Sequence, residues 1–207
     1  MAVDLPGHGT STLPFGDLDG DARHVVDVVT RLSRPVVLVG HSYGGAVITE
    51  AAARLRGMTS APVRHLVYIA AFCPDEGESV MDLARHESAG PVDLGAAMIP
   101  VDGGLSVLDP EKAAPALYGD CDARAAAAAL ARLCPQPLAT MLQPVSSAPW
   151  KTIPSTYVVC TRDRAVHPGN QEYMARRCTH VVRLDTDHSP FLSMTEKTAD
   201  VLEGVAG

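Results

Sequence analysis

The sequence Gly-His-Ser-Tyr-Gly at residues 40–44 most constrains what this chain can fold into. It follows an apolar run at 36–39 and precedes a segment of helical character at 43–56. A Gly-x-Ser-x-Gly turn between a strand and a helix strains the serine backbone and exposes the hydroxyl above the sheet. The flanking glycines are expected to be required, because side chains there would collide in so tight a turn. The pattern therefore predicts that Ser42 is a nucleophile.

Short apolar runs alternate with helix-like segments along much of the chain. The predicted strands are 36–39, 65–72, 155–160 and 181–184, and the predicted helices are 17–32, 43–56 and 171–178. The sequence Ser-Met-Thr-Glu at 193–196 is a capping box that predicts the start of a closing helix. Apolar strands alternating with helices indicate a mostly parallel sheet with helices on both faces. With 207 residues, we expect a single α/β domain, residues 1–207.

Residues from about 74 to 149 break this rhythm and are rich in Pro, Gly and Ala. An insertion between two strands is most simply a helical cap over the carboxyl edge of the sheet. It contains a predicted helix at 122–133 with five consecutive alanines. We interpret this alanine run as structural filler and not as a binding motif.

The net charge of −7 argues against nucleic acid or an anionic membrane as the main partner. The sequence begins with no charged-then-apolar leader and contains no apolar stretch long enough to cross a bilayer, which favours a cytoplasmic location. Five cysteines without C-x-x-C spacing fit free thiols in a reducing compartment. The eight histidines show no metal-ligand spacing, so no metal is expected.

Three polar residues follow predicted strands and are therefore expected at one edge of the sheet. Ser42 follows the first strand, Asp163 the third and His188 the fourth. A serine hydroxyl becomes a good nucleophile when an imidazole accepts its proton, and a carboxylate orients the imidazole and stabilises its charged form. We therefore predict Ser42 as nucleophile, His188 as base and Asp163 as the orienting carboxylate.

Other residues compete for these roles. Asp75, after the second strand, is the nearest rival carboxylate, whereas Asp187 would have to fold back onto its neighbour's ring. His65 and His180 precede their strands and are expected at the opposite edge. His41 lies inside the turn, where its ring is expected to pack and not to act as a base.

Several motifs in a specific order resemble the α/β-hydrolase superfamily, in particular its branch of small esterases and hydroxynitrile lyases. The matching stretches are 4–9, 38–45, 66–72 with 74–77, 161–163 and 187–191. The resemblance implies a Ser-His-Asp triad, a helical cap over the pocket, no cofactor, and a small ester or related carbonyl substrate.

The chain departs from the lyases at one position. Those enzymes carry a lysine just after the catalytic histidine, where this chain has Ser189, and its only lysines are Lys112, Lys151 and Lys197. Hydrolysis is therefore favoured over cyanohydrin cleavage.

The second departure is at the N-terminus, where the resemblance implies a truncated fold. Family members begin with earlier strands, one of which ends in a His-Gly loop that supplies an oxyanion-hole amide. This sequence starts at what resembles the tail of the next strand, residues 2–4, so the missing strand would lie between that tail and 36–39. The Tyr43 N–H remains as the obvious oxyanion donor, and losing one donor costs roughly 100- to 1,000-fold in turnover.

Three explanations of this N-terminus are open: a start codon assigned too far downstream, a chain cut short, or a divergent protein whose exposed edge pairs with something else. The first two are together favoured over the third. We expect weak catalysis and homo-oligomers formed through the exposed sheet edge.

The leading hypothesis is a serine hydrolase that cleaves a small carboxylic ester through an acyl-enzyme. A lyase using the same triad would release an aldehyde or ketone without consuming water. A non-catalytic or weakly catalytic binding protein would keep the pocket without the chemistry. The intact triad positions argue against the binding protein, and the missing oxyanion strand argues for it.

Overall fold

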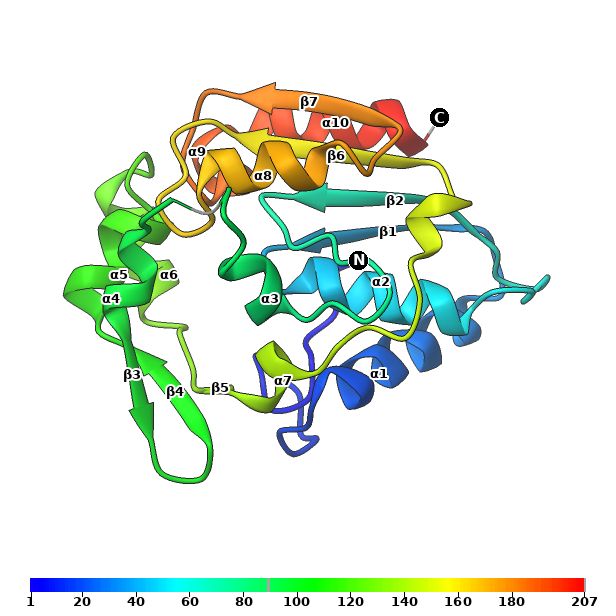
Figure 1. Ribbon diagram of the computed structural model, residues 1–207, viewed down its shortest axis with the longest axis horizontal. Coiled ribbons are helices and arrows are strands. Elements are labelled where there is room, and N and C mark those ends of the chain that lie inside the picture. The colour runs from blue at the N-terminus through cyan, green and yellow to red at the C-terminus, as the bar shows by residue number, and fades with distance from the viewer. Residues whose placement is uncertain (89, 207) are drawn as a thin grey trace.

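The core of the protein is a four-stranded parallel sheet with the order β1-β2-β6-β7 (Figure 1). The computed structural model describes residues 1–88 and 90–206. The strands are β1 (Val36–His41), β2 (Val63–Ile69), β6 (Ser155–Cys160) and β7 (His180–Leu184). All four arrowheads point to the same side of the molecule, so the carboxyl ends of the strands share one edge. The predicted parallel sheet is thus present.

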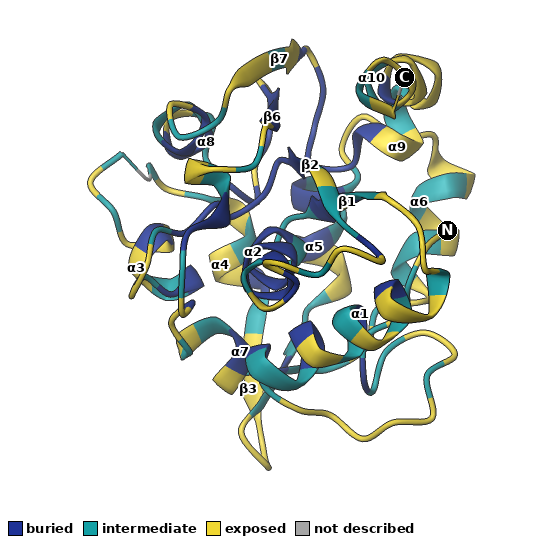
Figure 2. Ribbon diagram, turned by 90° about the vertical axis from the view of Figure 1, so that its right-hand side faces the viewer, coloured by how far each residue is buried: buried dark blue, intermediate teal, exposed yellow. Residues whose placement is uncertain are grey.

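Helices cover both faces of this sheet, because the strands alternate side chains between two apolar layers. Leu66 and Tyr68 pack in the layer formed with α1 (Leu18–Leu32), α2 (Gly44–Arg54) and α8 (Pro168–Ala175). Val67 and Ile69 pack in the opposite layer against α10 (Thr195–Ala206). Figure 2 shows that α2 is largely buried between these elements. The sheet is therefore a rigid base for the loops at its carboxyl edge.

Some element boundaries differ from the predictions for local reasons. The second strand was predicted at 65–72 but ends at Ile69, because Ala70 adopts a left-handed backbone with φ of 44°. The helix predicted at 171–178 begins three residues earlier, at Pro168, where the His167 ring accepts a hydrogen bond from the Gly169 N–H. The apolar pattern correctly predicted that these elements exist, whereas local turns and helix caps determine where they begin and end.

The closing helix forms, but the predicted capping box at 193–196 does not start it. Ser193 is the last residue of a short helix, α9 (Pro190–Ser193), and α10 begins at Thr195. The Ser193 hydroxyl donates instead to Asp187 at 3.1 Å and lies 2.6 Å from the Thr186 hydroxyl. The Ser193 hydroxyl therefore bonds the preceding loop and does not cap the N-terminus of α10, as the local pattern had predicted.

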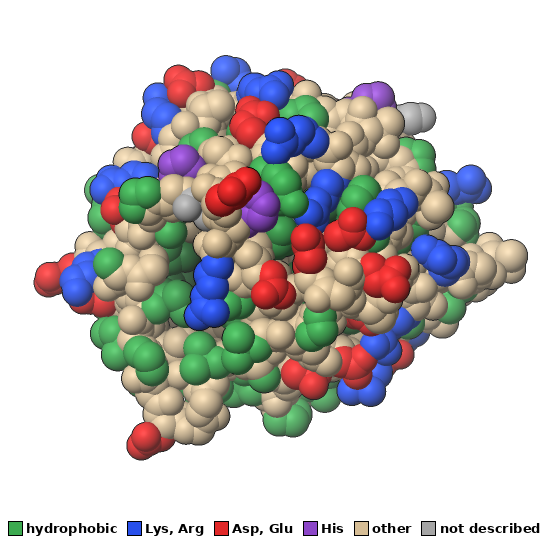
Figure 3. All heavy atoms as spheres, in the orientation of Figure 1, with side chains coloured by type: hydrophobic (Ala, Val, Ile, Leu, Met, Phe, Trp, Pro, Cys, Tyr) green, Lys and Arg blue, Asp and Glu red, His purple; other side chains and the backbone are tan. Residues whose placement is uncertain are grey.

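We call residues 74–149, which lie between β2 and β6, the cap. Its helices are α3 (Val80–Ala84), α4 (Asp93–Ala97), α5 (Pro110–Leu117), α6 (Ala123–Leu130) and α7 (Ala139–Leu142), followed by a 3-10 turn, η1 (Pro149–Lys151). Its strands form a small antiparallel sheet of β3 (Met98–Val101), β4 (Leu105–Leu108) and β5 (Gln136–Pro137). In Figure 1 α4, α5 and α6 lie on the side to which the strands of the large sheet point. Figure 3 shows hydrophobic side chains gathered over this part of the surface.

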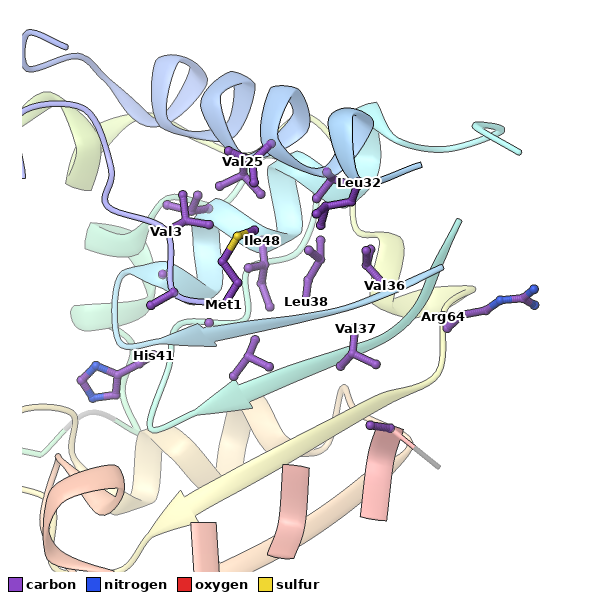
Figure 4. A pocket seen from close by; sticks show the side chains of 18 of the residues that line it. Met1, Val3, Val25, Leu32, Val36, Val37, Leu38, His41, Ile48 and Arg64 are labelled. Carbon is purple, nitrogen blue, oxygen red and sulfur yellow. The ribbon is translucent and has the colours of Figure 1, made fainter. Parts of the chain in front are cut away.

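β1 is an edge strand, and an apolar groove of about 760 Å³ runs beside it. Residues 2–4, expected as the tail of a strand, form no strand, and within residues 1–88 and 90–206 no strand pairs with the outer side of β1. Figure 4 shows Met1, Val3 and Leu38 around this space, with α1 on its far side. Residues 1–3 and β1 both line this groove, where the resemblance implied a further strand. Among the described residues, no helix has the length and apolar character that crossing a bilayer would require.

Candidate active site

Ser42 occupies a sharp turn between β1 and α2. Its φ is 53°, a left-handed conformation that is strained for a residue with a side chain. Its N–H donates to the carbonyl of Ile69 at 3.3 Å, and its carbonyl accepts from the N–H of Phe72 at 3.1 Å. Two hydrogen bonds to the end of β2 thus hold the turn in this conformation.

The glycines around this turn do not all have the expected role. A Cβ at Gly40 would lie 2.4 Å from the Gly44 carbonyl oxygen, which confirms that only glycine fits there. A Cβ at Gly44 would meet nothing within 4 Å, so the expectation that this glycine is sterically required is wrong. Gly45 is the second tight position, because a Cβ would lie 2.2 Å from the carbonyl oxygen of Phe72. The close packing of α2 against the end of β2 imposes this requirement.

His188 and Asp163 meet at the carboxyl edge of the sheet. The loop after β7 carries His188, the loop after β6 carries Asp163, and both side chains are buried. His188 Nδ1 lies 2.7 Å from Asp163 Oδ2. Because a carboxylate accepts hydrogen bonds, Nδ1 carries the proton and Nε2 keeps its lone pair in the neutral ring. That tautomer has its basic nitrogen turned away from the carboxylate.

The Asp163 carboxylate is held by a hydrogen-bond network beyond His188. One oxygen accepts from the backbone N–H groups of Ala165 and Val166 at 2.7 and 2.9 Å. The other oxygen accepts from Gln171 Nε2 at 2.7 Å, and this fully buried amide also bonds Val166 and the Cys160 N–H. Sequence reasoning missed Gln171, because a single glutamine in a helix has no local signal of burial.

His41 packs against His188 and is not positioned as a second base. Its Nε2 donates to the His188 carbonyl at 2.8 Å, and the two ring centroids are 4.4 Å apart. Its ring also makes an edge contact with Phe191 at 4.9 Å between centroids. Burial, followed by the charge of His188, lowers the pKa of His41 to about 3, so its ring is neutral near pH 7.

The rival residues lie elsewhere or have other partners. Asp75 pairs with Lys151, and the carboxylate at His188 is that of Asp163. Asp187 is buried, but its oxygens accept from the Asp120 N–H at 2.9 Å and the Ser189 N–H at 3.1 Å. It therefore connects the His188 loop to the cap.

The histidines assigned to the opposite edge lie at the amino-terminal ends of their strands. His180 is the first residue of β7, and His65 lies near the start of β2. His65 Nε2 is 2.9 Å from the Thr156 hydroxyl on the neighbouring strand. Neither residue lines the cavity that contains Ser42.

Tyr43 immediately precedes α2. Among residues 1–88 and 90–206, no atom accepts a hydrogen bond from its backbone N–H. Its phenol donates to the Asp21 carboxylate of α1 at 2.7 Å, where burial raises the pKa of Asp21. The side chain thus fixes the residue to α1 while its N–H remains available at the start of a helix, where anions are stabilised.

One cavity of about 660 Å³ is lined by His41, Ser42, Tyr43 and His188. Its remaining wall is mostly apolar and comes largely from the cap, including Leu94, Met98, Leu108, Leu117 and Met141. Three alanines of α6 also line it, so the alanine run contributes a wall as well as a helix. Within the described residues, no group of three or more His, Cys, Asp or Glu side chains is arranged to hold a metal ion. The cavity therefore offers a hydroxyl, an imidazole and a helix start to an apolar ligand of moderate size.

Comparison with known proteins agrees with this architecture. Residues 1–201 match the alpha/beta hydrolase family. The alpha/beta hydrolase nvfD of Aspergillus novofumigatus is 32% identical over 219 residues, which cover 100% of this chain and 85% of that protein. The crystal structure of a pyrethroid hydrolase from Sphingobium faniae JZ-2 superposes with a TM-score of 0.83 at 23% identity, covering 98% of this chain and 84% of that one. Polyneuridine aldehyde esterase superposes with a TM-score of 0.83 at 18% identity, covering 100% and 87%.

These matches confirm the fold inferred from the motifs and the parallel sheet. They also confirm the resemblance to the α/β-hydrolase superfamily. The chain is a hydrolase that belongs to the alpha/beta hydrolase family.

Proposed function

We propose that the protein is a serine esterase that cleaves a small carboxylic ester with Ser42, His188 and Asp163. The observation that carries the proposal is the 2.7 Å bond from His188 to Asp163, with His188 and the strained Ser42 lining one cavity. The bond leaves Nε2 of His188 as the free basic nitrogen. A base of that kind in the cavity of a strained serine fits acyl transfer.

In the proposed reaction, Ser42 Oγ attacks the ester carbonyl carbon while His188 Nε2 takes the hydroxyl proton. The carbonyl oxygen becomes an oxyanion that the Tyr43 N–H stabilises. The intermediate collapses, the C–O bond to the alcohol breaks, and His188 returns the proton to the departing alkoxide. Water then attacks the acyl-enzyme through the same steps and releases the acid. The Asp163 carboxylate neither gains nor loses a proton in these steps, and it stabilises the imidazolium of His188.

Two features support hydrolysis over the lyase alternative. Among the described residues that line the cavity, none is a lysine that could hold a departing cyanide. Ser189, at the position where the resembling lyases carry lysine, is buried and donates its N–H to Asp187 at 3.1 Å. A lyase would convert a cyanohydrin into an aldehyde or ketone, so assaying cyanohydrins beside esters separates the two reactions.

Covalent labelling tests the proposal directly. A fluorophosphonate probe should label Ser42, and Ser42→Ala should abolish both the label and the turnover of p-nitrophenyl butyrate. Ser106→Ala is the matched control, since Ser106 lines the same cavity but has no role in the proposed chemistry. It should keep both signals.

A folded protein that neither reacts with the probe nor hydrolyses any short ester would overturn the proposal. That result would favour the third hypothesis, a binding protein on a hydrolase fold. Circular dichroism of the same samples shows whether the protein is folded.

A further inference from the structure

The charge of the active-site cavity differs from the charge of the chain as a whole. The chain carries 24 Asp and Glu against 17 Lys and Arg, a net charge of −7. Among the described residues that line the 660 Å³ cavity, none is an Asp or Glu, whereas Arg132 and His8 both line it. An apolar cavity with basic side chains and no acidic one favours a ligand that is apolar but carries a negative charge.

Arg132 follows α6, whose alanines form one wall of the cavity. Its side chain forms no ion pair with any residue in the described ranges, whereas six of the other thirteen arginines are ion-paired. Its charge acts on Asp4, whose pKa is lowered first by the Thr10 N–H and hydroxyl and only then by Arg132 and His8. Both Thr10 bonds, at 2.8 Å, are made to Asp4 Oδ2. The guanidinium therefore keeps its donors for a ligand.

His8 lines the same cavity as Arg132. Its Nδ1 lies 2.9 Å from the Pro6 carbonyl and its Nε2 lies 3.1 Å from Gln136 Oε1. Both ring nitrogens therefore face acceptor groups of the protein.

The orientation of the Gln136 amide is set by its other partners. Its Nε2 lies 2.6 Å from the Thr140 hydroxyl, which donates its only proton to the Pro137 carbonyl at 2.6 Å. The Thr140 oxygen can therefore only accept from Gln136, and the amide must turn its oxygen toward His8. This chain of bonds fixes the position of the His8 ring in the wall of the cavity.

Resting on the proposed function, we infer that the preferred substrate is an ester whose apolar body ends in a carboxylate, and that Arg132 binds that carboxylate. His8 lines the same cavity, and Gln136 fixes the position of its ring. The apolar cap residues contact the aliphatic part of the substrate between its ester and its carboxylate. Arg132 is then a specificity-determining residue, because it acts on a part of the substrate that takes no part in the chemistry.

Matched substrates test this inference. Monomethyl suberate and methyl octanoate have the same eight-carbon acyl chain and the same ester, and differ in the terminal carboxylate. The kcat/KM for methanol release should favour monomethyl suberate, and in Arg132→Gln this preference should fall about tenfold, through KM and with kcat kept. Arg132→Lys should restore most of the preference. Comparing kcat/KM for monomethyl adipate, monomethyl suberate and monomethyl sebacate identifies the substrate length that reaches from Ser42 to Arg132.

Arg124→Gln is the matched control, because Arg124 lies on α6, which Arg132 follows, is exposed like Arg132 and does not line the cavity. It should leave the preference unchanged. Methyl octanoate should be turned over equally by the wild type and Arg124→Gln. Turnover of methyl octanoate with no preference for any of the three acid esters would overturn this inference and leave the proposed function intact.

Binding gives a readout that does not need catalysis. In the Ser42→Ala background, calorimetric titration with monomethyl suberate should give a Kd that Arg132→Gln weakens about tenfold. Equal affinities with and without Arg132 would overturn the inference even if the protein proves to have no esterase activity. Failure of the proposed function would instead appear as absent probe labelling and absent turnover of both esters.

Discussion

His41 Nε2 donates a hydrogen bond to the backbone carbonyl of His188 at 2.8 Å. The residue before the proposed nucleophile thus holds the loop that carries the proposed base. Because a carbonyl oxygen only accepts, the bond fixes the His41 tautomer with its proton on Nε2. The bond strengthens the connection between the turn after β1 and the loop after β7.

The depressed pKa of His41 predicts that the protein loses stability in mild acid. His41 takes up a proton in the unfolded chain near pH 6.5 but, in the folded protein, only near pH 3. The free energy of unfolding should therefore fall as the pH drops from about 6.5 to about 3, by at most about 1.4 kcal/mol per pH unit from this group. Urea unfolding at pH 7, 6, 5 and 4 measures the slope.

His41→Gln keeps an amide donor near the His188 carbonyl and removes the titrating ring, so its stability should depend less on pH. His180→Gln changes an exposed histidine and should retain the wild-type slope. Equal slopes for the wild type and His41→Gln would contradict the lowered pKa of His41 as the cause of the pH dependence.

Asp163→Asn should lower kcat by roughly 10⁴-fold, because an amide cannot stabilise the imidazolium and favours the wrong tautomer of His188. Asp187→Asn is the matched control, since Asp187 is adjacent to His188 and equally buried but bonds other groups. Steady-state kinetics with p-nitrophenyl butyrate should show a far smaller loss for Asp187→Asn. A comparable loss in both variants would mean that Asp163 has no special role.

Gly45→Ala should destabilise the fold, whereas Gly44→Ala should not. A Cβ at Gly45 would lie 2.2 Å from the Phe72 carbonyl oxygen and 2.9 Å from Ala71 Cβ, so the backbone must shift at a cost of about 1–3 kcal/mol. A Cβ at Gly44 meets open space in the first turn of α2, where alanine stabilises a helix by up to about 1 kcal/mol. Chemical unfolding of the two variants measures the difference, and equal stabilities would contradict the close packing of α2.

The free edge of β1 leads us to propose that copies of this chain associate through it. The strand has one paired side, its Val39 is 43% exposed, and the apolar groove of Figure 4 lies beside it. Val39→Lys places a charge on this edge and should shift the protein toward monomers. Light scattering coupled to size exclusion, over a range of protein concentrations, measures the change.

Val181→Lys is the matched control on β7, the opposite edge of the same sheet, where Val181 is 37% exposed. It should leave the association unchanged. A wild-type chain that stays monomeric at high concentration, or an equal effect of both lysines, would refute association through β1.

The sequence by itself determined the order of strands and helices and the three residues expected at one edge. This worked because each of Ser42, Asp163 and His188 follows a short apolar strand, and parallel strands bring their carboxyl ends together. The turn at 40–44 could also be recognised, since its strain is local to a few residues.

Only the tertiary structure decided which neighbours hold these residues in place. Gln171 bonds Asp163, His41 bonds the His188 loop, and Gly45 is required by the Phe72 carbonyl in the segment after β2. The predictions that Gly44 is sterically required and that residues 193–196 cap the closing helix were wrong for the same reason. Steric fit and hydrogen bonding depend on atoms distant in the sequence, which a local pattern does not contain.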